Sequence, residues 1–193
     1  MSRRLVVLVA IAAVAIAGGW WLRTTRVARA PNVASSAPAA AGTAPAGDTR
    51  KITATLYYIS EDGMALVGVK REVPFGESVV DQGRQIVAAQ LGSAPPPFAS
   101  AIPANVTLRG FYVTERGDAF VDLSPEARTG HTGGALDELF TVYAIVNALT
   151  TNLPAVSRVQ ILIDGKEVDT LAGHVDLRHP LQKNLKWVRG DQG

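Results

Sequence analysis

The sequence contains no cysteine, few aromatic residues and, beyond its first 49 residues, no excess of positive charge. The lack of cysteine excludes disulfide bonds, thiolate metal sites and a thiol nucleophile. Residues 1–49 hold five of the 19 Lys and Arg residues but one of the 17 Asp and Glu residues, which leaves 14 basic and 16 acidic residues for the rest. A nucleic-acid-binding domain needs a basic face, so we expect no nucleic-acid partner.

One long apolar run lies near the start of the chain. The 18 residues Leu5–Leu22 carry no charge, follow two arginines and end next to two tryptophans. Eighteen helical residues extend about 27 Å, close to the thickness of a bilayer's hydrocarbon core. We therefore predict a single transmembrane anchor over residues 1–23. A cleaved signal peptide is the alternative, but the run is longer than the usual apolar core of one and arginines crowd the cleavage region.

An Ala/Pro/Ser-rich linker, residues 24–50, is predicted to follow the anchor. Its part from 31 to 49 has one charged and no aromatic residue, so it cannot bury enough apolar surface to offset the entropy of ordering. Its prolines favour an extended chain. We expect this segment to hold a folded domain, residues 51–181, clear of the membrane, with residues 182–193 as a solvated basic C-terminal tail.

The remaining residues alternate between strand and helix patterns. Runs rich in β-branched and aromatic residues, in pairs separated by turn residues, predict hairpins over 52–73, 106–124 and 158–171. Helical spacing predicts helices over 79–91, with Ser78 as its N-cap, and over 135–153. The order ββα-ββα-ββ favours an α+β fold: a mainly antiparallel mixed sheet with both helices packed on one face, preceded by the transmembrane helix.

The longer predicted helix carries one apolar stripe that should face the core. The stripe consists of Leu136, Leu139, Phe140, Tyr143, Val146, Leu149 and Leu153. Pro154 ends the helix. Leu139 and Tyr143 lie in the middle of the stripe, so we expect both to be buried.

Several short motifs together resemble the GerMN ("germane") domain family. They are Ala119–Ser124, the helical run Ile145–Thr150, Pro154, the strand and turn Val159–Lys166, and Val175–Leu177, and they extend the resemblance over about residues 52–181. The resemblance implies a fold similar to the ring-building domains of envelope machines and an extracytoplasmic location. It implies no catalytic residues, because none are known for the family.

The chain departs from that family pattern in two respects. It has no lipobox cysteine, so the predicted membrane span would replace a lipid anchor, and it has one domain copy where sporulation members carry two. The resemblance also implies an orientation, with the N-terminus in the cytoplasm and the domain outside. The implied location is the bacterial inner membrane, with the domain in the periplasm or extracytoplasmic space.

Five residues are candidates for binding. His131, Gly133 and Gly134 precede the N-terminus of the longer helix and are interpreted as a flexible helix entry. Contact with an anion or a glycan is the alternative, although the lysine of a P-loop is absent. Asp122 and Ser124 lie on the polar side of a strand. A serine hydrolase would need a G-x-S-x-G elbow, which the sequence lacks, so Ser124 is expected to satisfy the backbone of the loop or helix that follows.

Three further patterns could carry chemistry but are interpreted as surface residues. The string His174, Asp176 and His179, with Asp164, Asp169 and the distant His131, has the residue types of a metal site, but such spacing alone is non-specific. Glu115 and Asp118 flank a turn where nothing would raise a carboxyl pKa for glycan hydrolysis. The basic residues of the tail surround Trp187 and could contact anionic lipid or wall polymer. We expect no cofactor, metal or catalytic residue.

The function most compatible with these features is a non-enzymatic, membrane-anchored module for assembly or binding in the cell envelope. Its partners would be the membrane and either an envelope protein or further copies of the chain. The alternative is a module that binds peptidoglycan or another glycan and positions a cell-wall hydrolase.

Overall fold

A computed structural model of the chain describes residues 50–131 and 133–190. The predicted membrane anchor and all but the last residue of the predicted linker lie outside these residues. Within the described ranges, no helix has both the length and the apolar character that a bilayer crossing requires.

The first sheet contains the hairpin that the sequence predicts near residue 60. Strands β1 (Lys51–Ile59) and β2 (Leu66–Pro74) pair antiparallel along their whole length. A short strand that the sequence did not predict, β8 (Val188–Arg189), runs parallel to β2 at Leu66 and Val67. The order of this sheet is therefore β1-β2-β8.

The second sheet contains the other predicted hairpins. Its strands are β3 (Leu108–Val113), β4 (Asp118–Leu123), β5 (Arg158–Ile163), β6 (Lys166–Glu167) and β7 (Leu181–Gln182). The order is β3-β4-β5-β6, with β7 also paired to β5. β4 and β5 are parallel because the two helices between them provide the crossover that parallel strands need.

The last predicted hairpin is only partly confirmed. Asp164 (φ 53°) and Gly165 (φ 73°) form the tight turn expected from their sequence, because a type I′ turn needs positive φ at both central residues. The predicted return strand over residues 168–171 is wrong, since β6 ends at Glu167. The chain then leaves the sheet and forms a loop.

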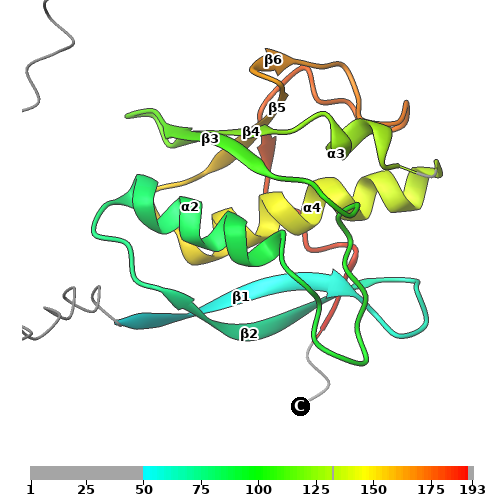
Figure 1. Cartoon of the computed structure of the whole chain (residues 1–193), viewed down its shortest axis with the longest axis horizontal. Coiled ribbons are helices and arrows are strands. Elements are labelled where there is room, and N and C mark those ends of the chain that lie inside the picture. Colours follow the sequence, from blue (N-terminus) through cyan, green and yellow to red (C-terminus); the bar gives the residue numbers. More distant parts are fainter. Residues whose placement is uncertain (1–49, 132, 191–193) are drawn as a thin grey trace, which may run out of the picture. The chain divides into compact units, whose positions relative to one another are not determined.

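Helices α2 (Val79–Gln90) and α4 (Ala135–Asn152) lie between the two sheets, and a short helix α3 (Glu126–Thr129) precedes α4 (Figure 1). The predicted N-cap of α2 is confirmed, because the Ser78 hydroxyl accepts a hydrogen bond from the Asp81 N–H at 3.0 Å. The α+β class is correct. The prediction of one sheet with both helices on one face is wrong, since the strands form two sheets on opposite sides of the helices.

This position buries α4 on almost every side. From Phe140 to Thr150, every residue except Tyr143 is buried. Leu136, Leu139 and Tyr143 pack against the core but are only partly buried, so the expectation that Leu139 and Tyr143 are buried is wrong. A helix covered by sheets on both sides has no solvent face in its middle, and this part of the sequence is accordingly apolar except for Thr141, Asn147 and Thr150, which are themselves buried.

α2 lies very close to the second sheet. A Cβ atom added to Gly83 would meet the ring of Phe111 on β3 at 2.2 Å. Glycine at this position therefore allows the contact that buries Phe111 completely.

Side chains from the helices close the free edge of β1. The Gln90 amide accepts from the N–H of Tyr57 at 2.9 Å and donates to its C=O at 2.7 Å. The Asn152 amide bonds both backbone groups of Thr55 at 2.8 Å. Ile59 exchanges backbone hydrogen bonds of 2.9 and 3.1 Å with Ala99. Every second residue from Thr55 to Ile59 thus has its outward backbone groups satisfied without another strand.

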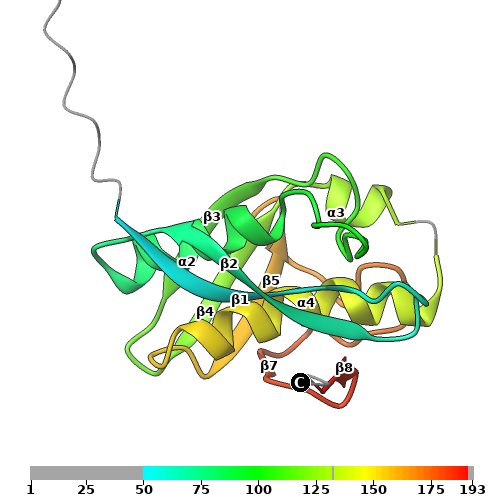
Figure 2. The same cartoon turned by 90° about the horizontal axis from the view of Figure 1, so that it is seen from below.

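The C-terminal segment belongs to the fold. After β7 it passes α4, where the backbone N–H and C=O of Asn184 bond the Asn147 amide at 2.9 and 2.8 Å, and it then joins the first sheet as β8 (Figure 2). Residues 182–189 are therefore attached to the fold, although most of their side chains are exposed as expected for a solvated segment. Two-residue strands have no periodicity by which a sequence could reveal them.

Candidate functional site

His131 lines a hollow of about 200 Å³ near the N-terminal end of α4. Its walls come from Ile59, the loop residues Ser100 to Pro103, Gly130, Asp137 and Thr141. The Nε2 atom of His131 is buried and has no hydrogen-bond partner among the described residues. A buried polar atom without a partner is energetically unfavourable, and binding sites are one place where such atoms occur.

Glycine positions the chain around this hollow. A Cβ atom on Gly130 would lie 2.9 Å from the Pro103 Cβ, so glycine allows the end of α3 to approach the proline-containing loop. Gly133 (φ 94°) and Gly134 (φ 109°) adopt conformations that other residues rarely tolerate. They direct the chain into α4. They come shortly after His131 in the sequence but do not line the hollow.

The other two predicted binding residues lie outside the hollow and make structural contacts. Asp122 accepts the N–H of Gly165 at 2.7 Å, and its other oxygen lies 3.7 Å from the Arg109 Nε. Arg109 also pairs with Asp164 at 3.0 Å. Asp122 therefore fixes the turn between β5 and β6 and ties it to β3. The five candidates are not brought together into one site.

Ser124 is buried, and its hydroxyl has a structural role that differs from the predicted one, because it bonds the segment before β3 and not the backbone of the helix that follows. Its hydroxyl accepts the Thr107 N–H at 3.0 Å, which joins β4 to the residue before β3. A hydrogen bond from the same hydroxyl is the main reason why the pKa of Glu126 lies below its usual value. With both functions of its hydroxyl in use, Ser124 is not arranged as a nucleophile.

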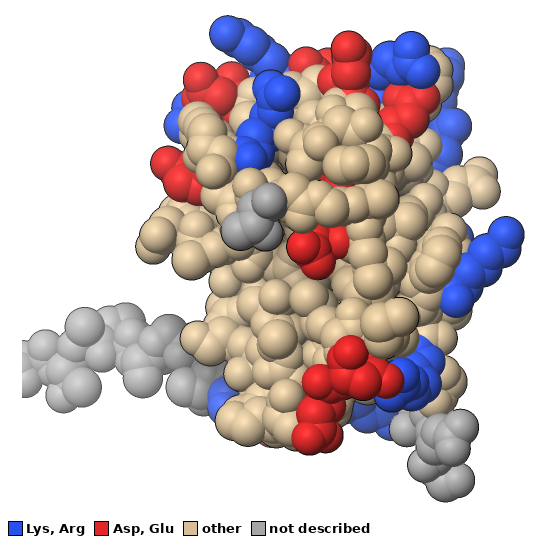
Figure 3. Space-filling view, turned by 90° about the vertical axis from the view of Figure 1, so that its right-hand side faces the viewer, with Lys and Arg blue, Asp and Glu red and all other residues tan. Residues whose placement is uncertain are grey.

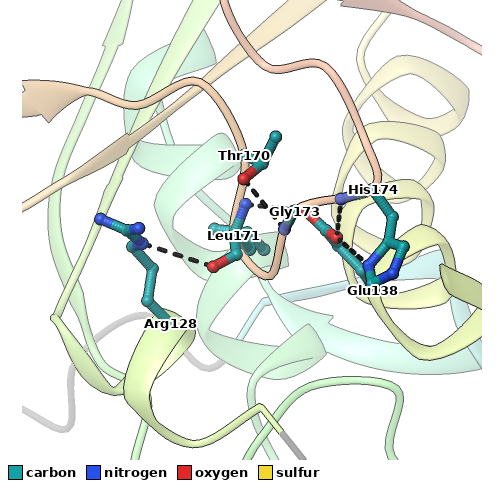
Figure 4. A network of polar contacts seen from close by, with 6 residues as sticks. All are labelled: Arg128, Glu138, Thr170, Leu171, Gly173 and His174. Carbon is teal, nitrogen blue, oxygen red and sulfur yellow. Dashed lines mark hydrogen bonds and ion pairs between the residues drawn. The ribbon is translucent and has the colours of Figure 1, made fainter. Parts of the chain in front are cut away.

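Glu138, which no sequence pattern singled out, has a side chain that is completely buried in the first turn of α4. Its carboxylate accepts the backbone N–H of Leu171 at 2.8 Å and of His174 at 2.7 Å, and the His174 ring Nδ1 lies 3.2 Å away (Figure 4). Burial raises the pKa of Glu138, but hydrogen bonds from Ala172, His174, Leu171 and Val175 outweigh it and hold the pKa below its usual value. Glu138 thus fastens the loop after β6 to the helix.

Neighbouring contacts complete the fastening of this loop. Arg128 on α3 donates to the Leu171 C=O at 3.3 Å, and the Thr170 hydroxyl accepts the Gly173 N–H at 3.0 Å (Figure 4). An acidic residue in the first turn of a helix is common, because it complements the helix dipole. No local feature of the sequence therefore distinguished Glu138 from its neighbour Asp137.

Two of the residues considered for a metal site have other partners. His174 contacts Glu138, and Asp176 accepts two hydrogen bonds from the Arg178 guanidinium at 2.9 and 2.7 Å. These bonds hold the pKa of Asp176 far below its usual value. Across residues 50–131 and 133–190, no three His, Asp or Glu side chains are grouped so that they could hold a metal ion.

Of the two residues considered for glycan hydrolysis, one is held in an ion pair and the other is exposed. Asp118 is bound in bidentate fashion by Arg158, with distances of 2.7 and 3.0 Å, because β4 and β5 place these two residues side by side. Glu115 is exposed in the turn between β3 and β4.

Comparison with solved structures identifies proteins of similar fold. Three solved structures share it: a predicted lipoprotein from Clostridium perfringens (24% identity, TM-score 0.51), the tandem GerMN domains of the sporulation protein GerM from Bacillus subtilis (22%, 0.52) and the first of those domains alone (21%, 0.51). In the same order, the alignments cover 69%, 70% and 69% of this chain. They cover 88%, 46% and 96% of the three solved chains. A search of curated proteins finds no significant match.

The family comparison agrees with the structural one. The model of the Germane family, described as sporulation and spore germination, matches residues 55–169, which run from within β1 to just beyond β6 and include the hollow at His131 and the buried Glu138. On the basis of this match, which extends over more than half of the sequence, the chain belongs to the Germane (GerMN) family.

Proposed function

We propose that this chain is a non-enzymatic module, anchored in the membrane by residues 5–22, that binds or assembles with another protein of the cell envelope. The observation that carries the proposal is the hollow at His131. It combines a buried imidazole nitrogen that has no hydrogen-bond partner among residues 50–131 and 133–190 with apolar walls from Ile59, Ile102 and Pro103. Apolar surface with a few unsatisfied polar groups is the usual composition of a binding site.

The surface around the hollow also favours a protein partner. On this face of the domain, Lys, Arg, Asp and Glu gather towards two opposite ends, and mostly uncharged residues lie between them (Figure 3). The centres of protein interfaces are poor in charged residues and their rims are polar, so this distribution suits contact with another protein.

A non-enzymatic role is supported by how the candidate catalytic groups are used. Asp118 is paired with Arg158, Asp122 with Arg109 and the Gly165 N–H, and Ser124 bonds Thr107. Each of these groups fixes one part of the fold to another, so none is available to a substrate without breaking that contact.

The extracytoplasmic location is supported by the relatives and by the N-terminal sequence. One relative is a predicted lipoprotein and another is a sporulation protein. The apolar run Leu5–Leu22 could supply the membrane attachment that a lipid would otherwise provide. We infer that the N-terminus lies in the cytoplasm and the domain outside.

This arrangement predicts the behaviour of a reporter fusion. A reporter that is active only outside the cytoplasm should be active when fused after Gly193, and the full-length chain should remain in the membrane fraction at its unprocessed mass. The same reporter fused before Met1 is the control and should be inactive. A soluble chain shortened at its N-terminus would show instead that the apolar run is a cleaved signal peptide.

A binding role for the hollow predicts a selective effect of His131→Ala. The substitution should lower capture of the envelope partner from crosslinked cells at least fivefold, because the imidazole supplies the hollow's unpartnered polar atom. It should not shift the melting temperature of the domain by more than about 2 °C, since no other described residue hydrogen-bonds to Nε2. His179→Ala, at an exposed position, is the matched control and should change neither quantity. Unaltered capture by the His131 variant would contradict this use of the hollow.

Glycan binding is a second candidate, because the Asp137 carboxylate and the His131 nitrogen line one small hollow and could both bond sugar hydroxyls. Sedimentation with insoluble wall material distinguishes the two candidates. A protein-binding module should remain in the supernatant, whereas a glycan-binding module should sediment and should lose this property in the His131→Ala variant.

A further inference from the structure

The outer strand of the second sheet, β3, differs from the outer strand of the first sheet, β1, whose outward backbone groups are hydrogen-bonded to the helices and to Ala99. β3 is the outermost strand, and the Thr114 N–H bonds the Asp118 C=O at 2.9 Å. Because bonding alternates along an antiparallel pair, the backbone groups of Phe111 and Val113 point away from β4. Within the described residues, no side chain or backbone group bonds them from outside, in contrast to the amides that close β1.

The open edge also lacks the charges that usually discourage strand addition. β2, where it extends beyond β8, carries Lys70, Arg71 and Glu72 in succession. β3 carries only Arg109, and that guanidinium is already paired with Asp122 and Asp164. The same strand also carries Tyr112, an aromatic side chain that is 60% exposed. As far as the described part of the chain shows, this edge therefore offers backbone groups without a partner and an apolar side chain without repelling charges.

The sequence of β3 suits pairing with itself. In an antiparallel pair centred on Tyr112, Phe111 lies opposite the partner's Val113 and Val113 opposite the partner's Phe111. This register uses all the outward backbone groups of both residues and avoids the bulge that lies between Leu108 and Gly110. It also places Tyr112 opposite the partner's Tyr112, where aromatic cross-strand pairs are favourable.

Gly110 makes room for the two rings. A Cβ atom on Gly110 would lie 3.0 Å from the ring and hydroxyl of Tyr112, so this ring leans back along its own strand over the glycine. Two tyrosines that lean away from a common axis can face each other across a strand pair without a clash. A larger residue at position 110 would push each ring towards the axis.

We propose that two copies of this chain associate through β3, in antiparallel pairing centred on Tyr112, so that their second sheets join into one continuous sheet. The pairing has two-fold symmetry, in which the same surface serves both copies. It does not involve the His131 hollow, so a module assembled in this way would present two such hollows.

The lack of cysteine allows a direct test in the full-length chain in its membrane. Opposite residues of a non-hydrogen-bonded strand pair have Cα atoms about 4.5 Å apart, within the range for a disulfide. Tyr112→Cys should therefore form a disulfide-linked dimer on mild oxidation. Met64→Cys, at a similarly exposed position (67%), is the control for random collision and should give at least tenfold less dimer.

A second substitution tests the edge itself. Adding Val113→Pro to the Tyr112→Cys chain removes one outward N–H and places a ring at the edge without breaking a bond to β4, so dimer yield should fall at least fivefold. Adding Val113→Thr, which keeps the N–H, should leave the yield unchanged.

Equal yields from the Tyr112 and Met64 variants, insensitivity to the proline, or a crosslink to a protein of different mass would each overturn the proposal. Sedimentation of the Val113→Pro and Val113→Thr chains without a cysteine provides the same comparison if the Tyr112 variant does not fold.

Discussion

Replacing Glu138 with alanine should lower the free energy of unfolding of residues 50–193 by about 3–5 kcal/mol, as expected when one member of a buried charged network is removed. The carboxylate is fully buried and accepts backbone N–H groups from four residues: Leu171, Ala172, His174 and Val175. Alanine would leave these donors without partners inside the protein, and the loop that they belong to would lose its attachment to α4.

Two further variants separate this role from a general effect of charge at the helix start. Asp137→Ala removes the neighbouring carboxylate, which is exposed, and should cost less than about 1 kcal/mol through the helix dipole alone. Glu138→Gln keeps the shape and one acceptor oxygen but presents an NH₂ group to the loop, so an intermediate loss of about 2 kcal/mol is expected. Urea denaturation followed by circular dichroism measures all three. A loss below about 1 kcal/mol for Glu138→Ala would show that the loop does not depend on this carboxylate.

The pH dependence of the unfolding free energy tests whether Glu138 is ionised in the folded protein. The pKa of Glu138 is lowered in the folded protein, so its contribution is complete above the pKa of an unfolded glutamate, about 4.3, and is lost as the pH falls towards the lower folded value. The difference in unfolding free energy between wild type and Glu138→Gln should therefore be constant above about pH 5 and shrink below it. Comparison with the glutamine variant is necessary because other carboxyl groups, such as Asp62 and Asp176, also have lowered pKa values.

Local sequence signals predicted the elements of this fold better than their arrangement. Ser78 with Asp81 indicated the start of α2, and Asp164-Gly165 indicated a tight turn, because both depend on neighbouring residues. The two-sheet arrangement depends on contacts between distant segments. Two signals could have predicted part of it: the strand–helix–strand order around α4 is typical of a parallel pair, and residues apolar on every side of a helix indicate burial on every side.

The candidate site was predictable to a similar extent. The glycines around His131 indicated the entry into α4, where Gly133 and Gly134 adopt positive φ. The other walls of the hollow come from Ile59 and the loop near residue 100, which no local pattern connects to His131. Glu138 could not be recognised for the same reason, since its hydrogen-bond partners follow 33 and more residues later.

The burial of α4 predicts a sharp contrast between two adjacent residues. Phe140→Ala should lower the free energy of unfolding by about 3–5 kcal/mol, because the ring is 1% exposed and its removal leaves a cavity in the closely packed layer between the sheets. Leu139→Ala should cost no more than about 1–2 kcal/mol, since Leu139 is only partly buried and the surrounding surface can adjust.

The same urea denaturation measures both changes, and the helix propensity of alanine does not explain the contrast, because both substitutions introduce the same residue. If α4 had only the predicted stripe facing one sheet, Leu139 and Phe140 would both lie in the core and the two losses would be similar. Ala144 and Ala148, which are completely or almost completely buried, provide an independent check of the two-sided packing. Enlarging either residue to leucine should destabilise the domain by about 1–3 kcal/mol, because a helix enclosed on both sides has no room for a larger side chain. Both residues lie on the side of α4 away from the predicted stripe, because residues four apart share one face of a helix. A helix with that side free would accommodate leucine at both positions without loss, and that result would contradict the enclosure of α4 between the two sheets.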